Sequence, residues 1–109
     1  MLVLLTAAPA QLLDDASGET VERIVARDSE YFPGEIVVKR GAPVVLELIA
    51  EDRDHGFNLP DFDVRVDVMV GRAARVRVTP SKAGRFQFHC DVYCGSGHDA
   101  MIGVLEAEE

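Results

Sequence analysis

Two cysteines, a histidine and a methionine lie within twelve residues near the end of the 109-residue sequence, in the segment CDVYCGSGHDAM. In order they are Cys90, Cys94, His98 and Met101, which gives the spacing Cys-x₃-Cys-x₃-His-x₂-Met. Thiolate, imidazole and thioether are soft or borderline ligands, and such ligands favour copper, zinc or iron–sulfur over magnesium or calcium. The two glycines between Cys94 and His98 let the backbone fold tightly around an ion. The segment therefore predicts a transition-metal site.

Two further histidines occupy different positions relative to this segment. His55 follows a charged loop at residues 51–54, so it could be a distant ligand that the fold brings to the segment. His89 directly precedes Cys90. If residues 85–90 form a strand, these two side chains point to opposite faces. We therefore expect His89 at the surface and not among the ligands.

The ligand types alone leave two alternatives to a copper site open. A disulfide between Cys90 and Cys94 would close a loop that seldom allows relaxed bridge geometry, and it would leave His98 and Met101 unexplained. A closed zinc site would combine both cysteines with His98 and His55, because Cys₂His₂ suits tetrahedral zinc. In that case Met101 would be an ordinary core residue.

The segments that would position these residues read as short strands separated by turns. Residues 61–70 alternate most clearly, because apolar side chains occupy every second position from Phe62 to Val70 and charged ones occupy most positions between them. This pattern is typical of a half-buried strand. Other strand-like segments lie at residues 21–26, 35–39, 44–50, 74–79, 85–90 and 102–105, with turns that include residues 31–34 and 40–43. No segment has the pattern of a long helix. The sequence predicts an all-β sandwich or barrel of about seven to eight strands.

The sequence is acidic, with 11 Lys and Arg against 19 Asp and Glu and a formal net charge of −8. Nucleic acids and anionic membrane surfaces attract basic proteins, so this charge argues against both as partners. It suits a basic protein partner, because opposite fields steer the encounter. A simpler interpretation is that the acidic residues keep the protein in solution.

The first ten residues form an apolar run that ends in Ala8-Pro9-Ala10. This run resembles the apolar region and cleavage site of a secretory signal, although it lacks the usual basic start. Residues 11–20 are expected to form a flexible lead-in, so that residues 1–20 precede one domain at residues 21–109. No stretch reaches the about 20 apolar residues that a spanning helix needs. We expect a periplasmic or other extracytoplasmic protein, whose tether to any membrane would be a processed N-terminus or a partner.

On these residues the sequence resembles the cupredoxin family over about residues 21–107. The resemblance includes Tyr31-Phe32-Pro33 before a strand, the turn at Gly41, and His55 before Gly56-Phe57. Its most specific part is the loop from Cys90 to Met101. It implies a Greek-key β-sandwich. With its second cysteine, the loop is similar to the dinuclear copper A (CuA) centre of cytochrome c oxidase subunit II and of nitrous oxide reductase, and it is closer to the oxidase type.

The resemblance implies a ligand set for two copper ions. The ligands would be His55, Cys90, Val92, Cys94, His98 and Met101. The two cysteines would be bridging thiolates, and each histidine would bind one ion. The methionine sulfur would be a weak axial ligand of the ion held by His55, and the backbone carbonyl of Val92 that of the other ion. An apolar shell is expected from Phe57, Phe86, Phe88 and Ile102. Such a centre would pass single electrons between redox partners, such as a cytochrome c and an oxidase subunit, and would not itself be an enzyme.

The sequence departs from oxidase subunit II in three respects. It contains no tryptophan, whereas subunit II proteins receive electrons from cytochrome c through an aromatic patch that includes tryptophan. It has no pair of N-terminal membrane helices. Val92 stands where many subunit II proteins place a carboxylate that also serves a magnesium ion. The docking partner and a magnesium site are therefore not carried over to this chain.

Three other functions fit the same residues. A mononuclear blue-copper cupredoxin would bind its ion through His55, Cys94, His98 and Met101 and would leave Cys90 as a spare thiol. A copper carrier or assembly protein would use the ligands without transferring electrons. The chain could also be a non-catalytic, electron-accepting subunit of a terminal oxidase in a respiratory chain.

Overall fold

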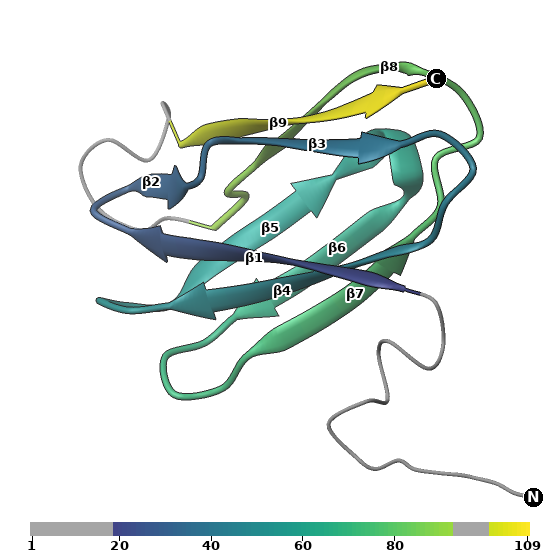
Figure 1. The fold of residues 1–109 in the computed structure, drawn as a ribbon. Coiled ribbons are helices and arrows are strands. Elements are labelled where there is room, and N and C mark those ends of the chain that lie inside the picture. Colours follow the sequence, from purple (N-terminus) through teal and green to yellow (C-terminus); the bar gives the residue numbers. More distant parts are fainter. Residues whose placement is uncertain (1–18, 93–100) are drawn as a thin grey trace, which may run out of the picture.

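The computed structural model describes residues 19–92 and 101–109, and the strands named here lie in these two stretches. Two β-sheets pack against each other as the layers of a sandwich (Figure 1). The strand order is β2–β1–β4–β7 in the first sheet and β3–β9–β8–β5–β6 in the second. The bounds are Thr20–Arg27 (β1), Glu30–Phe32 (β2), Glu35–Lys39 (β3), Val44–Ala50 (β4), His55–Leu59 (β5), Val64–Val68 (β6), Ala74–Val78 (β7), Gly84–His89 (β8) and Ile102–Glu108 (β9). A short 3₁₀ helix, Pro60–Phe62, follows β5.

The predicted all-β sandwich is confirmed, with nine strands in the described residues where about seven to eight are expected. The two unexpected strands are β2 and β5. The sequence predicts a turn at residues 31–34, but β2 pairs with the end of β1. β5 contains Gly56 and Asn58, which are poor strand formers. Its pairing with β6 and β8 makes this segment a strand.

The alternating segment at residues 61–70 is a strand only in its centre. β6 alternates as predicted, with Val68 buried and the charged residues exposed. Asp63 has a φ of 56°, a left-handed conformation that separates the 3₁₀ helix from the strand. Val70 is 50% exposed. The prediction that it shares the buried face is therefore wrong, because the strand ends at Val68 and the chain turns towards β7.

β4 lies between β1 and β7 in the first sheet, and its residues are buried apart from the half-buried Ile49. Glu47 is the charged residue on this strand. Its Oε2 accepts from Nη2 of Arg75 at 2.8 Å, and its Oε1 accepts from Nε of Arg23 at 2.9 Å. These hydrogen bonds, from Arg75 first and then Arg23, hold the pKa of Glu47 below its ordinary value. The carboxylate therefore stays ionised, and the ion pairs satisfy it on the outer face of the sheet.

Three aromatic rings form the part of the core that lies nearest the predicted ligands. Phe57 of β5 and Phe88 of β8 are fully buried, and Tyr31 of β2 is nearly so. The ring centroids lie 4.9 Å apart for Phe57 and Phe88 and 5.0 Å apart for Tyr31 and Phe88. These separations allow favourable aromatic contacts. Cys90 and Met101 belong to the same buried cluster, so two of the predicted ligands are part of the core itself.

Within the described residues, no helix combines the length and the apolar character needed to cross a membrane. The signal-like run predicted at residues 1–10 lies outside this part of the chain, as does the lead-in up to residue 18.

Candidate metal centre

His55 is the first residue of β5, and its imidazole is buried with 1% of the residue exposed. Its Nε2 lies 2.8 Å from Oδ1 of Asp52. Its Nδ1 is buried and has no hydrogen-bond partner among the described residues. A buried polar atom without a partner is costly, so the free side of this ring is suited to a ligand-binding role.

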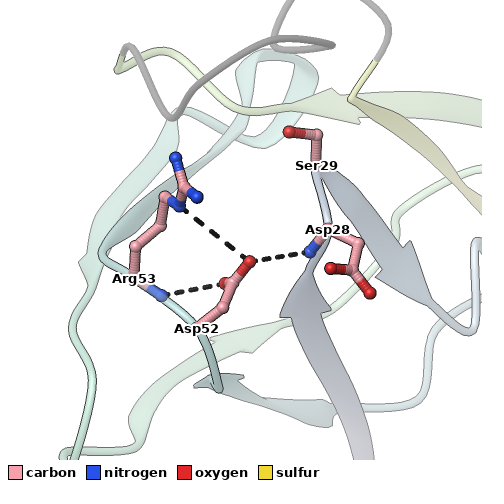
Figure 2. Close-up of a pocket in the computed structure, with 4 residues that line it drawn as sticks. All are labelled: Asp28, Ser29, Asp52 and Arg53. Atoms are coloured by element: carbon pink, nitrogen blue, oxygen red, sulfur yellow. Dashed lines mark hydrogen bonds and ion pairs between the residues drawn. The ribbon is translucent and has the colours of Figure 1, made fainter.

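The carboxylate of Asp52 determines which nitrogen of His55 carries a proton. It accepts from the backbone N–H of Asp28 at 2.9 Å and from that of Arg53 at 2.8 Å (Figure 2). The hydrogen bond to His55 first, and then the backbone hydrogen bonds from Asp28 and from its own N–H, lower the pKa of Asp52 to about 2, although burial acts in the opposite direction. An ionised carboxylate is only an acceptor, so Nε2 is the nitrogen that donates, and in the neutral imidazole Nδ1 is then the nitrogen with the lone pair. A metal-binding histidine typically donates its second ring N–H to a carboxylate in this way.

Cys90 follows β8 and is buried, with contacts to two other predicted ligand segments. Its Sγ accepts from the backbone N–H of Gly56, next to His55, at 3.3 Å. The thiol donates to the carbonyl oxygen of Val92 at 3.2 Å. Metal binding removes a thiol proton, so the same sulfur and carbonyl oxygen could then both face an ion.

Met101 precedes β9 and is buried, with 1% of the residue exposed. Its carbonyl oxygen accepts from the backbone N–H of Cys90 at 3.2 Å, which joins the two ends of the predicted ligand loop. His55, Cys90, Val92 and Met101 are thus linked by short contacts, directly or through a neighbouring residue. Cys94 and His98 lie outside the described residues.

The described residues alone contain no group of three or more His, Cys, Asp or Glu side chains that could hold a metal ion. A complete site would therefore need donors in addition to His55 and Cys90. The sequence offers Cys94 and His98 for this purpose. The thioether of Met101 and the carbonyl of Val92 would complete the set.

The other predictions for residues near the site have different outcomes. Phe57 and Phe88 are fully buried, and Phe86 packs against the core. Ile102 is 45% exposed, so the prediction that it belongs to the apolar shell is wrong, because its side chain lies on the outer side of β9. His89 is half-buried and lies opposite Ile102 in the β8–β9 register.

Asp52 contacts the candidate ligand His55 and is not among the residues that the sequence predicts for the site. The signal in the sequence is its position three residues before His55, in a loop that is distinguished only by its charge. A spacing of three does not by itself predict a contact in a loop. The contact arises because the N–H groups of Asp28, in the β1–β2 turn, and of Arg53 orient the carboxylate.

A surface hollow of about 350 Å³ opens beside the candidate ligands. It is lined by Asp54, His55, Asp67, Met69 and Val92. Met69 is 45% exposed and the next residue, Val70, is 50% exposed. The hollow therefore combines apolar and acidic groups next to two candidate ligands.

Comparison with known proteins relates the chain to copper-protein families. A model of the cupredoxin-like domain family matches residues 1–103. Cytochrome c oxidase subunit 2 of Thermus thermophilus is 34% identical over 79 residues, which are 72% of this chain and 58% of that protein. A second subunit 2 sequence from the same organism gives the same identity over 79 residues, which are 47% of that protein. The chain thus spans about half the length of these curated relatives.

Solved structures share the two-sheet architecture. The periplasmic domain of subunit II of cytochrome oxidase from Bradyrhizobium japonicum has a TM-score of 0.73 at 20% identity, with 83% of this chain and 84% of that domain covered. Auracyanin A, a blue copper protein of Chloroflexus aurantiacus, has a TM-score of 0.68 at 14% identity, with 84% of this chain and all of that chain covered. At these identities the likeness establishes the fold and nothing further.

Proposed function

Because the chain belongs to the cupredoxin-like domain family and is homologous to cytochrome c oxidase subunit 2, we propose that it is an electron-transfer protein with a dinuclear, mixed-valence copper centre of the CuA type. The proposed ligands are His55, Cys90, Val92, Cys94, His98 and Met101. The chain itself would carry electrons and would not catalyse a reaction.

One observation supports this proposal above the others. His55 presents a buried Nδ1 without a hydrogen bond among the described residues, while Asp52 fixes the other side of the ring. The next residue, Gly56, donates its N–H to the sulfur of Cys90. A histidine buried only for packing would not need one nitrogen oriented by a carboxylate and the other left without a partner. The arrangement is that expected of a metal ligand.

Copper bound in this site would supply a one-electron couple that the polypeptide lacks. The residues have three tasks. Asp52 and the N–H of Gly56 would orient the imidazole and the sulfur, the core around Phe57 and Phe88 would exclude water, and strands β5, β8 and β9 of one sheet would hold His55, Cys90 and Met101 in one geometry. A rigid site lowers the structural rearrangement that accompanies each electron transfer, because the ligands need not move when the charge changes.

The first experiment is a visible absorption spectrum with metal counting on the copper-loaded protein. We expect two thiolate-to-copper bands and about two copper ions per chain, because two soft thiolates can each bind both ions. A single strong blue band with about one ion per chain would contradict the dinuclear site. A colourless protein that holds zinc would exclude electron transfer.

A mononuclear blue-copper site is the second candidate, because the fold also matches that of auracyanin A. It would bind one ion through His55, Cys94, His98 and Met101. In that case Cys90 would have no ligand role, although its sulfur lies among the ligand segments and accepts a hydrogen bond from Gly56. Its position therefore favours the dinuclear proposal.

The proposed partner is a redox protein with a basic surface, such as a cytochrome c or another oxidase subunit, outside the cytoplasm. The net charge of −8 would steer a basic protein towards this chain. The hollow lined by Asp54, His55, Asp67, Met69 and Val92 offers acidic groups around an apolar surface. An electron that enters through this hollow would reach a candidate ligand, His55 or Val92, directly. The association rate with a basic cytochrome c should then fall steeply as salt is added.

Replacing Asp52 by alanine is expected to weaken copper binding by about 10–100-fold, the usual effect of removing a carboxylate that orients a metal-binding histidine. Without the carboxylate, the ring of His55 loses its fixed tautomer and orientation. The measurement is a copper titration against a competing chelator. The copper affinity of Asp52→Asn should lie between those of the unmodified protein and of Asp52→Ala, because the amide oxygen still accepts from Nε2 but carries no charge.

Asp54→Ala is the matched control, since this neighbouring carboxylate accepts from the N–H of Val70 and makes no hydrogen bond to His55 among those described. It should bind copper as the unmodified protein does. Equal weakening by both substitutions would mean that loop charge, and not the contact with His55, is responsible.

A further inference from the structure

Asp91 lies between two proposed ligands, Cys90 and Val92, and its carboxylate is held from the neighbouring strands. Arg65 of β6 donates from Nε to Oδ2 at 2.8 Å and from Nη2 to Oδ1 at 2.9 Å. Asn58 of β5 adds a longer contact to Oδ2 at 3.4 Å. A two-pronged guanidinium–carboxylate pair fixes direction as well as distance. The backbone on either side of Asp91 is therefore tied to β6.

The ion-paired side chains of Arg65 and Asp91 lie against Gly56, in the space that a Cβ at this position would need. A Cβ added at Gly56 would collide with Oδ1 of Asp91 and would lie 3.4 Å from Nη2 of Arg65. The backbone of Gly56 also makes two contacts of its own. Its N–H donates to Sγ of Cys90, and its carbonyl accepts from the hydroxyl of Tyr31 at 2.7 Å. The absence of a side chain lets the carboxylate and the sulfur both approach the residue that follows His55.

We propose that the Arg65–Asp91 pair, seated over Gly56, is a clamp that holds Cys90 and the Val92 carbonyl in their ligand positions before metal binds. This inference rests on the proposed copper site and adds positioning residues to it. The clamp would act through the ligands and would not touch an ion. Holding a binding loop in its bound conformation strengthens binding, because less conformational entropy is lost when the ligand arrives.

The clamp can be separated from a general contribution to stability. The side chains of Arg65 and Asp91 are 40% and 22% exposed, and exposed ion pairs contribute little to the stability of a fold. Arg85 provides the matched control. Its side chain is 56% exposed and bridges Glu35 and Glu106 at 2.9 and 3.0 Å, on strands of the same sheet but away from the candidate ligands.

The experiment measures copper affinity for Asp91→Ala, Arg65→Ala, the double variant and Arg85→Ala, with thermal unfolding of each. We expect each clamp variant to bind copper about 10–100-fold more weakly, with melting temperatures close to that of Arg85→Ala. The double variant should be no weaker than either single one, because the two residues act as a unit. Asp91→Asn should rescue part of the affinity. Gly56→Ala should weaken copper binding in the same way, although Arg65 and Asp91 both keep their charges. If this variant does not fold, the variants of Arg65 and Asp91 test the clamp without it.

A second readout uses the metal-free protein, so that the clamp can be judged apart from the copper proposal. Amide hydrogen exchange at Cys90 and Gly56 should accelerate in Asp91→Ala and remain unchanged in Arg85→Ala. Unchanged exchange at both amides would overturn the clamp, as would unchanged copper affinity in a protein that binds copper. If the unmodified protein binds no copper, the proposed function fails, and the exchange rates still decide whether the clamp exists.

Discussion

Replacing Cys90 by serine is expected to lower bound copper from about two ions per chain to about one or none, and to abolish the paired thiolate-to-copper bands. The hydroxyl of serine can accept from the N–H of Gly56 and donate to the carbonyl of Val92, as the thiol does. The fold should therefore persist, and the loss would come from the missing thiolate. Copper counting and visible absorption on the purified variant measure the effect.

The two copper proposals predict opposite results for this variant. A mononuclear site built on Cys94 would keep its colour and its single ion after Cys90→Ser. Retention of one ion with an intense blue band and an unchanged potential would therefore refute the dinuclear centre. Circular dichroism of the metal-free variant is the control for folding.

Replacing Phe88 by alanine is expected to cost about 3–5 kcal/mol of unfolding free energy, the usual range for deleting a buried phenylalanine ring. Phe88 is fully buried, and its ring packs against Tyr31 and Phe57. On its other side lies Gly103, where an added Cβ would collide with the ring. The glycine has no side chain that can move in to fill the space, so a cavity would remain. Urea denaturation followed by circular dichroism measures the loss.

Phe86→Ala is the comparison for this prediction. Phe86 lies on the same strand, is only half-buried and packs edge-on against Phe62 with 5.0 Å between ring centroids. It should cost clearly less than Phe88→Ala. Equal losses would show that the core does not depend on the ring cluster beside the site.

Sequence periodicity predicts the strands that have one buried and one exposed face. It does not predict a strand whose apolar pattern is interrupted, or the pairing of strands that are distant in sequence. β6 is predicted because its valines alternate with charged residues. β5 is not predicted, because Gly56 has no side chain and so interrupts any apolar pattern. A Cβ at this position would collide with the carboxylate of Asp91. The parallel pairing of β1 with β4 and of β3 with β9 could not be predicted either, since it depends on packing between distant segments.

The same distinction holds at the candidate centre. The spacing of sulfur and imidazole groups predicts Cys90 and Met101, and the resemblance to cupredoxins implies His55. The structure buries all three residues. The residues proposed to orient these ligands cannot be predicted from the sequence, because their contacts depend on strand register. Arg65 reaches Asp91 across 26 positions of sequence, through the pairing of β6 with β5. Cys94 and His98 remain predictions.

The parallel pairing of β3 with β9 affects the order of events during folding. Glu35 lies opposite Val104 in this pair, so most of the domain separates the two strands in sequence. Pairs so distant form slowly, because closing a long loop costs entropy before its contacts are gained. The hydrogen bond between Cys90 and Met101 lies just before β9 and depends on its docking. A newly made chain would therefore pass through a period in which its thiols are exposed, and oxidation would compete with metal acquisition during that time.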